Sequence, residues 1–195
     1  MKSSLMLGVN PNTIRQSEDF YATEPSAMEL FYERWNKDGN EFYFKIWEPA
    51  CGMGHLSKVL ENHRHEVMST DLIYRGYGEG GINFLDDVQF DAKDFWEGDI
   101  LTNPPFKLAE KFIEKGISRL FEGRYLFLFL KIQFLEGQNR KKLFEKYPPK
   151  YVYCYSARQK CARDGEFEKY TATTQFYAWY VWEKGFTGET IIRWI

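Results

Sequence analysis

The sequence predicts an α/β protein built on an open, mostly parallel sheet with helices on both of its faces. Short apolar or aromatic runs alternate with amphipathic stretches along the chain, as expected when each strand of a parallel sheet is followed by a covering helix. The run Tyr125 to Leu130 is unbroken and apolar, which is typical of a central strand buried on both faces. The 195 residues suit one domain with a full core.

The first half of the chain is expected to supply two helices and two strands. Glu24-Pro25 opens a helical pattern with its apolar residues on one face, and Asp38-Gly39-Asn40 ends it. Aromatic residues predict a strand over 42–47. A second helix begins near Leu56, and 66–70 predicts a short strand ending at an acid.

The second half continues the alternation after a segment rich in glycine and acids, 74–98, which is expected to wind around a site. A strand over 99–102 precedes a helical stripe over 108–121. A basic helix is expected over 137–146. Two further runs predict the final strands, 151–155 and 175–182.

Composition limits the class of protein. The net charge of −2 argues against tight binding of nucleic acid through bulk charge alone. No apolar run reaches the length of a membrane span, no signal pattern opens the chain, and an odd number of cysteines, three, fits a reduced cytoplasm. We expect a single domain over 1–195, of which residues 1–16 are polar, irregular and partly mobile.

The most informative stretch is the corner Asn103-Pro104-Pro105-Phe106, which follows the strand at 99–102. Each proline fixes its own φ, lacks an N–H and disfavours helix in the residue before it, so the chain leaves the strand extended and rigid. Backbone carbonyls and the Asn103 amide can accept hydrogen bonds from an amine there, while Phe106 can stack on a flat ring. An ordinary strand-ending turn is the alternative, because prolines also end strands.

The loop Glu48-Pro49-Ala50-Cys51-Gly52-Met53-Gly54 predicts a cofactor site, because small residues let the backbone approach a ligand at a strand-to-helix turn. A nicotinamide dinucleotide site would require a third glycine, and a glutamate here would oppose a phosphate. Glu48 instead suits a ligand that carries an ammonium and a sulfonium. Asp71, at the end of the next strand, is placed to bind two ribose hydroxyls. Alternatively, both acids are only polar strand ends.

With these motifs in this order, the sequence resembles the S-adenosylmethionine-dependent DNA adenine N6 methyltransferases, especially their small phage-type members. Asp19-Phe20-Tyr21-Ala22-Thr23 is similar to the N-terminal cofactor motif of that family, and Glu48 to Gly54 is similar to its methionine-binding loop. Asp71 matches the ribose-binding acid, and Asn103-Pro104-Pro105-Phe106 matches the catalytic motif. The resemblance covers about residues 15–160.

The resemblance implies a seven-stranded Rossmann-like methyltransferase sheet, S-adenosylmethionine as the cofactor and DNA as a partner. Asn83-Phe84-Leu85 stands where the family usually has Asp-Phe-Leu, which contacts the cofactor adenine. Asn83 is neutral where the family has an acid, whereas Phe84 retains a ring that can stack. The expected cofactor-binding residues are Tyr21, Thr23, Glu48, Ala50, Gly52, Asp71, Asn83 and Phe84.

The catalytic residues expected are Asn103, Pro104, Pro105 and Phe106. An aromatic amine shares its lone pair with the ring and is a poor nucleophile. Two acceptors, the Asn103 side-chain oxygen and the Pro104 carbonyl, would hold its two hydrogens and aim the lone pair at the methyl group, so catalysis is mainly positioning by fixed dipoles. The target base must leave the stack, and Phe106 would hold it by stacking.

Contacts to nucleic acid are expected from a loop that carries Arg158, Lys160 and Arg163. A DNA-contact loop and a plain surface loop explain these cations equally well. We expect no separate target-recognition domain within these residues. Specificity is therefore expected to be short or loose, or to come from a partner or a second copy in a homodimer. A phage-encoded member would act in the host cytoplasm.

Other functions remain open on the sequence alone. A methyltransferase for RNA base amines or protein glutamine would share the cofactor site and Asn103. A non-catalytic nucleotide-binding module is less consistent with the intact Asn103 corner, and a dehydrogenase lacks its third glycine. His55, His63 and His65 have no carboxylate or cysteine partner at ligand spacing, so surface or helix-end positions are expected and no metal.

Overall fold

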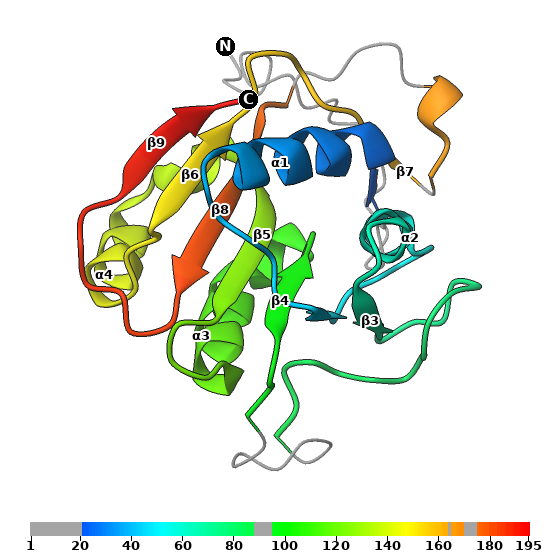
Figure 1. Ribbon diagram of the computed structural model, residues 1–195, viewed down its shortest axis with the longest axis horizontal. Helices are drawn as coiled ribbons and strands as arrows, with labels where there is room; N and C mark the ends of the chain where they lie inside the picture. The colour runs from blue at the N-terminus through cyan, green and yellow to red at the C-terminus, as the bar shows by residue number, and fades with distance from the viewer. Residues whose placement is uncertain (1–20, 88–94, 164, 170–174) are drawn as a thin grey trace, which may run out of the picture.

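The computed structural model describes residues 21–87, 95–163, 165–169 and 175–195. Its main feature is an open seven-stranded sheet (Figure 1). The strand order is β3 (Glu66–Ser69), β2 (Lys45–Glu48), β4 (Asp99–Thr102), β5 (Tyr125–Lys131), β8 (Tyr177–Glu183), β6 (Tyr151–Cys154) and β9 (Ile191–Trp194). Only β8 runs antiparallel to its neighbours, β5 and β6. The predicted open, mostly parallel, seven-stranded sheet is therefore confirmed.

Helices cover both faces of this sheet, as predicted. On one face, α1 (Pro25–Lys37) and α2 (His55–Asn62) pack with buried residues of β2, β4, β5, β6 and β8. On the other, α3 (Ala109–Arg119) and α4 (Gln138–Lys146) pack against alternate residues of the same sheet. Two apolar cores result, one on each side of the strands.

Aromatic packing fixes α1 on the sheet. The helix begins at Pro25, whose missing N–H is tolerated in the first turn. The ring of Phe31 stacks on Trp179 of β8 at 4.8 Å with an interplanar angle of 14°, and Trp35 meets Phe127 of β5 edge-on at 5.2 Å. All four rings are fully buried. Each buried side chain of this size contributes about 1.5–3 kcal/mol, so this layer is a major source of stability.

The strand predicted over 42–47 begins three residues later than expected, at Lys45. Phe42 is buried in the α1 core, and the backbone N–H of Tyr43 donates to the carboxylate of Asp99 across 2.8 Å. The N–H of Tyr125 donates to the other Asp99 oxygen at 2.9 Å. Asp99 therefore joins the start of β4 to the start of β5 and to the segment before β2. Burial raises the pKa of Asp99 to about 6.

A second, two-stranded sheet was not expected. Its strands, β1 (Tyr21–Thr23) and β7 (Cys161–Arg163), run antiparallel, with Thr23 opposite Cys161. The backbone N–H of Glu24 extends the pairing by donating to the carbonyl of Lys160 at 3.1 Å. This pairing fixes the Tyr21–Thr23 motif beside the loop that carries Arg158.

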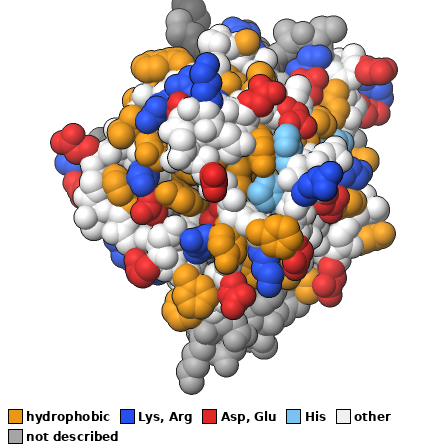
Figure 2. Space-filling model, in the orientation of Figure 1, with side chains coloured by type: hydrophobic (Ala, Val, Ile, Leu, Met, Phe, Trp, Pro, Cys, Tyr) orange, Lys and Arg blue, Asp and Glu red, His pale blue; other side chains and the backbone are white. Residues whose placement is uncertain are grey.

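The face that carries α1 and α2 shows basic and acidic side chains intermixed, without a large region of one sign (Figure 2). This distribution matches the small net charge of −2. Among the described residues, no helix is both long enough and apolar enough to cross a membrane. All three cysteines are free thiols.

Candidate active site

The ends of β2 and β3 are tied together at the carboxyl edge of the sheet. The Thr70 N–H donates to the Glu48 carbonyl at 2.9 Å, and the Cys51 N–H donates to the Thr70 carbonyl at 3.0 Å. A cleft opens at this edge between the loop after β2, the strand β1 and the end of β4. Its lining comprises Tyr21, Ala22, Thr23, Glu48, Ala50, Cys51, His55, Leu56 and Asn103.

The space inside this cleft is about 20 Å³, which is room for a single water molecule. A nucleoside-sized ligand must therefore displace one of the walls or extend along the open side. Five residues expected from the sequence line it: Tyr21, Thr23, Glu48, Ala50 and Asn103. Residues of the expected cofactor motifs and Asn103 of the expected catalytic motif, which are separate in the chain, thus line one cleft.

Asn103 directly follows β4, and its side chain is held by β1. Its Nδ2 donates to the Tyr21 carbonyl at 3.1 Å and to the Thr23 hydroxyl oxygen at 3.0 Å. Because a carbonyl oxygen can only accept, the nitrogen end of the amide must face Tyr21. The Oδ1 oxygen is then the end that remains for a ligand. β1 therefore determines which way the Asn103 amide is oriented.

The two prolines after Asn103 differ in exposure and in bonding. Pro104 is buried and Pro105 is exposed. The Leu108 N–H donates to the Pro105 carbonyl at 2.8 Å, so the following 3₁₀ helix η2 (Phe106–Leu108) occupies the carbonyl of Pro105 rather than that of Pro104. The ring of Phe106 is 43% exposed. The corner thus presents an aromatic surface next to a fixed amide.

Glu48 closes β2 and is almost fully buried. Its carboxylate accepts hydrogen bonds from the Ser57 N–H at 2.9 Å and from the Ser57 hydroxyl. Burial raises the pKa of Glu48 to about 8, although the bonds from Ser57 oppose this shift. The side chain is therefore largely protonated at neutral pH, and a cation placed beside it would favour loss of that proton.

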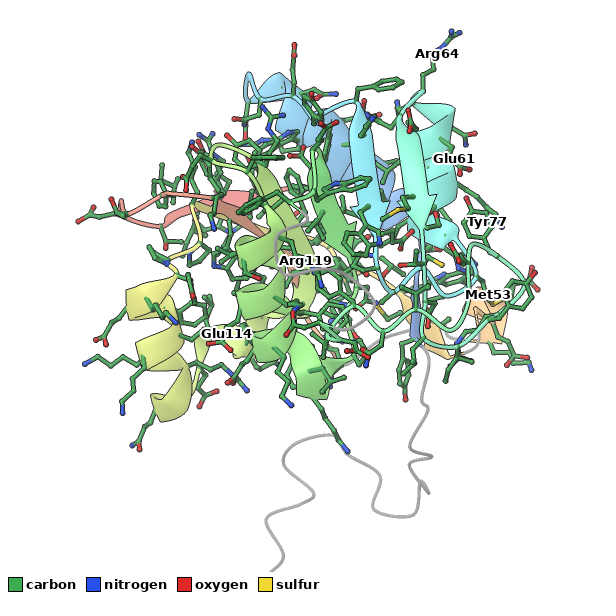
Figure 3. All side chains as sticks on the ribbon, turned by 90° about the horizontal axis from the view of Figure 1, so that it is seen from below. Met53, Glu61, Arg64, Tyr77, Glu114 and Arg119 are labelled. Carbon is green, nitrogen blue, oxygen red and sulfur yellow. The ribbon has the colours of Figure 1, made fainter. Side chains whose placement is uncertain are left out.

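The loop after β2 is held by Asp71, the acid that follows β3. The Gly52 N–H donates to one Asp71 oxygen at 2.8 Å, and the Ile73 N–H donates to the other at 2.9 Å. Gly54, at φ +76°, ends the loop against the ring of Tyr77, which fills the place of a side chain. Tyr77 lies beside α2, near Met53 and Glu61 (Figure 3), and its hydroxyl donates to Glu61 at 2.6 Å.

Asn83 and Phe84 lie away from the lining of this cleft. The Asn83 side-chain oxygen accepts from the Leu85 N–H at 3.1 Å, which forms a local turn. Phe84 is only 2% exposed, and its ring packs against Trp47 at 5.1 Å and Phe112 at 5.0 Å. The ring is therefore part of the core between α3 and the sheet, and it offers little surface to a ligand.

The three cations expected to contact DNA differ in their surroundings. Arg158 is exposed, and its guanidinium lies 4.9 Å from the ring centroid of Phe176. The Lys160 amine is 3.8 Å from the Glu24 carboxylate. The backbone of Arg163 lies opposite that of Tyr21 in the small sheet. All three come from the segment that carries β7, beside the cleft.

His55 is a lining residue that the sequence reasoning placed only at a helix end. It is the first residue of α2 and is half-buried, and burial lowers its pKa. Its Nδ1 atom is buried and has no hydrogen-bond partner among the described residues. The available signal was its position directly after the glycine loop. Within the described part of the chain, no group of side chains is arranged to hold a metal ion.

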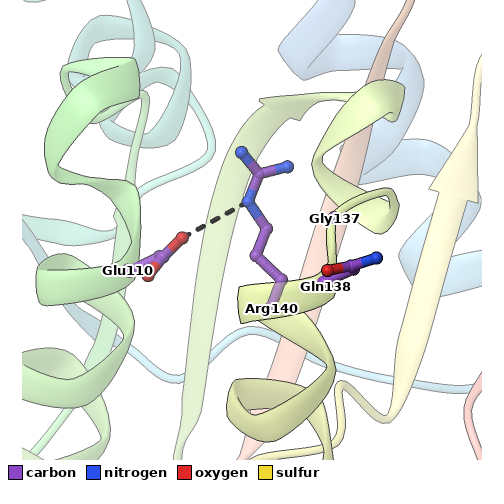
Figure 4. A pocket seen from close by; sticks show the side chains of 4 residues that line it. All are labelled: Glu110, Gly137, Gln138 and Arg140. Carbon is purple, nitrogen blue, oxygen red and sulfur yellow. Dashed lines mark hydrogen bonds and ion pairs between the residues drawn. The ribbon is translucent and has the colours of Figure 1, made fainter.

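A wider cleft lies between α3 and α4 and is lined by Glu110, Gly137, Gln138 and Arg140 (Figure 4). Arg140 is already engaged: its Nε donates to Glu110 at 3.3 Å, and it also donates to the carbonyls of Phe134 and Glu136. These bonds join α4 to α3 and to the 3₁₀ helix η3 (Ile132–Leu135). The role of Arg140 is therefore structural, because its guanidinium holds these segments together.

Comparison with solved structures identifies the architecture. A Listeria monocytogenes protein assigned to the class I S-adenosylmethionine-dependent methyltransferases superposes with a TM-score of 0.63 at 14% identity, covering 89% of this chain and 65% of its own. A type I restriction-modification methyltransferase subunit from Streptococcus thermophilus gives 0.61 at 15% identity, covering 91% and 48%. This chain has the class I methyltransferase fold.

A third neighbour matches over nearly its whole length. This Pyrococcus horikoshii protein, assigned to the RNA methyltransferases, gives a TM-score of 0.57 at 13% identity and covers 92% of this chain and 95% of its own. By contrast, this chain spans 65% and 48% of the Listeria and Streptococcus proteins. No protein-family model matches the sequence, and no curated protein matches it.

Proposed function

We propose that this protein transfers a methyl group from S-adenosylmethionine to the exocyclic N6 amine of adenine in DNA. The observation that carries this proposal is the single cleft in which Asn103 lies with Glu48, Ala50 and the Tyr21–Thr23 strand. A methyl donor and a methyl acceptor must meet within one site, and the lining of this cleft includes residues expected for each.

The residues that would hold the cofactor have suitable chemistry. Glu48 would pair with its ammonium group, and Asp71 would bind ribose hydroxyls. Both Asp71 oxygens already accept backbone N–H bonds, but each carboxylate oxygen has a second lone pair. The small side chain of Ala50 and the absence of a side chain at Gly52 would let the backbone approach the ligand closely. When bound, S-adenosylmethionine supplies an electrophilic methyl group on a sulfonium.

Asn103 would act on the amine of the substrate. Its Oδ1 atom and the Pro104 carbonyl would accept the two N–H bonds of the amine and direct its lone pair away from the ring plane. The bond from Asn103 Nδ2 to Tyr21 would keep the oxygen in position. No strong base is required, because the nitrogen becomes cationic and acidic once it carries the methyl group, and its proton can pass to water.

The choice of DNA rests on the resemblance of the motifs and on the names of two neighbours. The Streptococcus protein is a restriction-modification methyltransferase subunit, and a type IIG restriction endonuclease gives a TM-score of 0.60 at 14% identity, covering 89% of this chain and 26% of its own. Phe106, exposed beside Asn103, would stack on the extruded base. We extend the proposal to a phage-type cytoplasmic enzyme with a short or loose target site, acting alone or as a homodimer.

Transfer of a radiolabelled methyl group onto DNA, RNA and protein, offered in parallel, tests this function. We expect label in DNA with the wild-type protein and none with Asn103→Ala. Label found only in RNA or only in protein would show that DNA is not the substrate. Label in none of the three would refute methyl transfer.

A further inference from the structure

Two exposed phenylalanine rings at the carboxyl edge of the sheet each lie next to a cation. Phe106 is 43% exposed, and the Lys131 amine is 5.1 Å from its ring centroid. Phe176 is 48% exposed, and the Arg158 guanidinium is 4.9 Å from its ring centroid. Phe106 belongs to the proposed catalytic corner, whereas Phe176 has no part in the proposed methyl transfer and Arg158 is expected only to contact DNA.

The two ring–cation pairs adjoin each other through β5 and β8. Lys131 is the last residue of β5 and lies opposite Tyr177, the first residue of β8. The Ile132 N–H then donates to the carbonyl of Phe176 at 2.8 Å. A continuous path of contacts therefore leads from Phe106 through Lys131 and Ile132 to Phe176.

This combination of groups matches what an unpaired polynucleotide strand requires. Exposed rings provide platforms for successive bases, and cations between them neutralise the phosphates that link those bases. The net charge of −2 means that any attraction for phosphate must come from local cations such as these. An intact duplex presents only an extruded base, because the neighbouring bases remain stacked on each other.

We propose that Phe176 and Arg158 form a second base-binding position, which receives the unpaired nucleotide next to the target. The target base stacks on Phe106, its neighbour stacks on Phe176, and Lys131 and Arg158 bind the phosphates. The inference rests on the proposed function only for the choice of target base. It predicts that the preferred substrate is a single strand, or duplex opened over at least two nucleotides.

The test measures binding of a short fluorescent oligonucleotide by anisotropy. The same adenine-containing sequence is offered as single-stranded DNA, single-stranded RNA and duplex DNA. Phe176→Ala should bind the single strand about ten-fold more weakly than wild type, and Phe176→Tyr should restore binding. Arg158→Gln should reduce the slope of log affinity against log salt by about 0.7.

Tyr43→Ala is the matched control, since it removes a ring that is 40% exposed and lies 4.1 Å from the guanidinium of Arg124, at the opposite edge of the sheet. It should bind like wild type. Equal losses in Phe176→Ala and Tyr43→Ala, or no loss in either, would overturn the second base position. Tighter binding of the closed duplex than of the single strand would also overturn it.

An abasic site beside the target adenine makes the test specific for stacking. The abasic site is placed on the 5′ side of the adenine in one oligonucleotide and on the 3′ side in another. In one of the two, the missing base should weaken binding to the wild-type protein but not to Phe176→Ala. Equal weakening in both proteins would contradict the inference. Failure of the proposed function can be told apart from failure of this inference. If strand binding depends on Phe176 but no methyl group is transferred, only the enzymatic activity is refuted. Methyl transfer to DNA with unchanged Phe176→Ala binding would refute only the second position.

Discussion

The side-chain amide of Asn103 donates to the backbone carbonyl of Tyr21 across 3.1 Å, although the two residues are 82 positions apart in the chain. This bond joins the end of β4 to the short strand β1. It orients the amide so that the oxygen, rather than the nitrogen, remains for a substrate. The first predictions concern this pair and its neighbour Thr23.

Asn103→Ala should abolish methyl transfer while leaving the fold and cofactor binding intact. Removing one fixed dipole at a reacting group typically lowers the rate by about 10²–10³-fold. Asn103→Asp is a second variant, which retains an acceptor oxygen but places another oxygen against the Tyr21 carbonyl. We expect both to lower kcat strongly, and Pro105→Ala to have a milder effect. Steady-state transfer rates, with thermal denaturation as the control for folding, provide the measurement. Wild-type kcat in Asn103→Ala would end the catalytic assignment.

Thr23→Val tests whether β1 positions Asn103. Valine has the same shape as threonine but cannot accept the hydrogen bond from Asn103 Nδ2, which spans 3.0 Å. The lost bond should lower the free energy of unfolding by about 1 kcal/mol. It should also lower kcat with little change in KM for the substrate. A change in stability alone, with kcat unaltered, would show that Thr23 has only a structural role.

Cofactor binding should depend on pH through Glu48. Burial raises the pKa of this side chain to about 8, so it carries a proton at neutral pH. A bound ammonium group favours the carboxylate and should release that proton. Affinity for S-adenosylmethionine is therefore expected to rise as pH increases toward about 8 and to level off above it. Calorimetry in buffers of different ionisation enthalpy measures the released proton directly.

Glu48→Gln keeps a side chain that can bond to Ser57 but cannot ionise. It should bind the cofactor more weakly and should release no proton. Glu97→Gln, a change at an exposed acid, serves as the control and should behave like wild type. Proton release by wild type and Glu48→Gln alike would assign the titration to another group.

Gly54→Ala should destabilise the protein strongly, because Gly54 has φ +76° and a Cβ atom there would overlap the ring of Tyr77. We expect a loss of about 3 kcal/mol, from backbone strain and steric overlap together. Gly39→Ala is the matched control, since its φ is +81° but its surroundings are open. It should lose only about 1 kcal/mol. Urea denaturation compares the two, and equal losses would show that Tyr77 does not constrain the loop.

Local sequence patterns were sufficient to predict the helices and strands that have a regular pattern of buried residues. The apolar run Tyr125 to Leu130 corresponds to β5, and the stripe over 108–121 contains α3. The prediction of a strand over 42–47 was less accurate. Phe42 is buried against the α1 core, and the Tyr43 N–H donates to the side chain of Asp99 instead of to a backbone carbonyl of a neighbouring strand. Aromatic residues therefore predicted burial correctly there, but not strand pairing.

The remaining features depend on contacts between distant segments. β1 and β7 are three residues each, too short for a periodic pattern, and they pair across most of the chain. β9 was also missed, since its four residues are largely exposed and adopt strand structure by pairing with β6. The sequence motifs located Glu48 and Asn103 at strand ends, but not the bond from Asn103 to Tyr21. Asn83, Phe84 and the cations of the 158–163 loop remain predictions as ligand contacts.

Mass spectrometry of nucleosides from treated DNA tests the central claim most directly. DNA lacking methylated adenine is incubated with S-adenosylmethionine and either the wild-type protein or Asn103→Ala, and is then digested to nucleosides. We predict N6-methyladenine from the wild-type reaction and none from Asn103→Ala. Unmodified adenine in both reactions, with methyl groups found on another base or on none, would contradict the account.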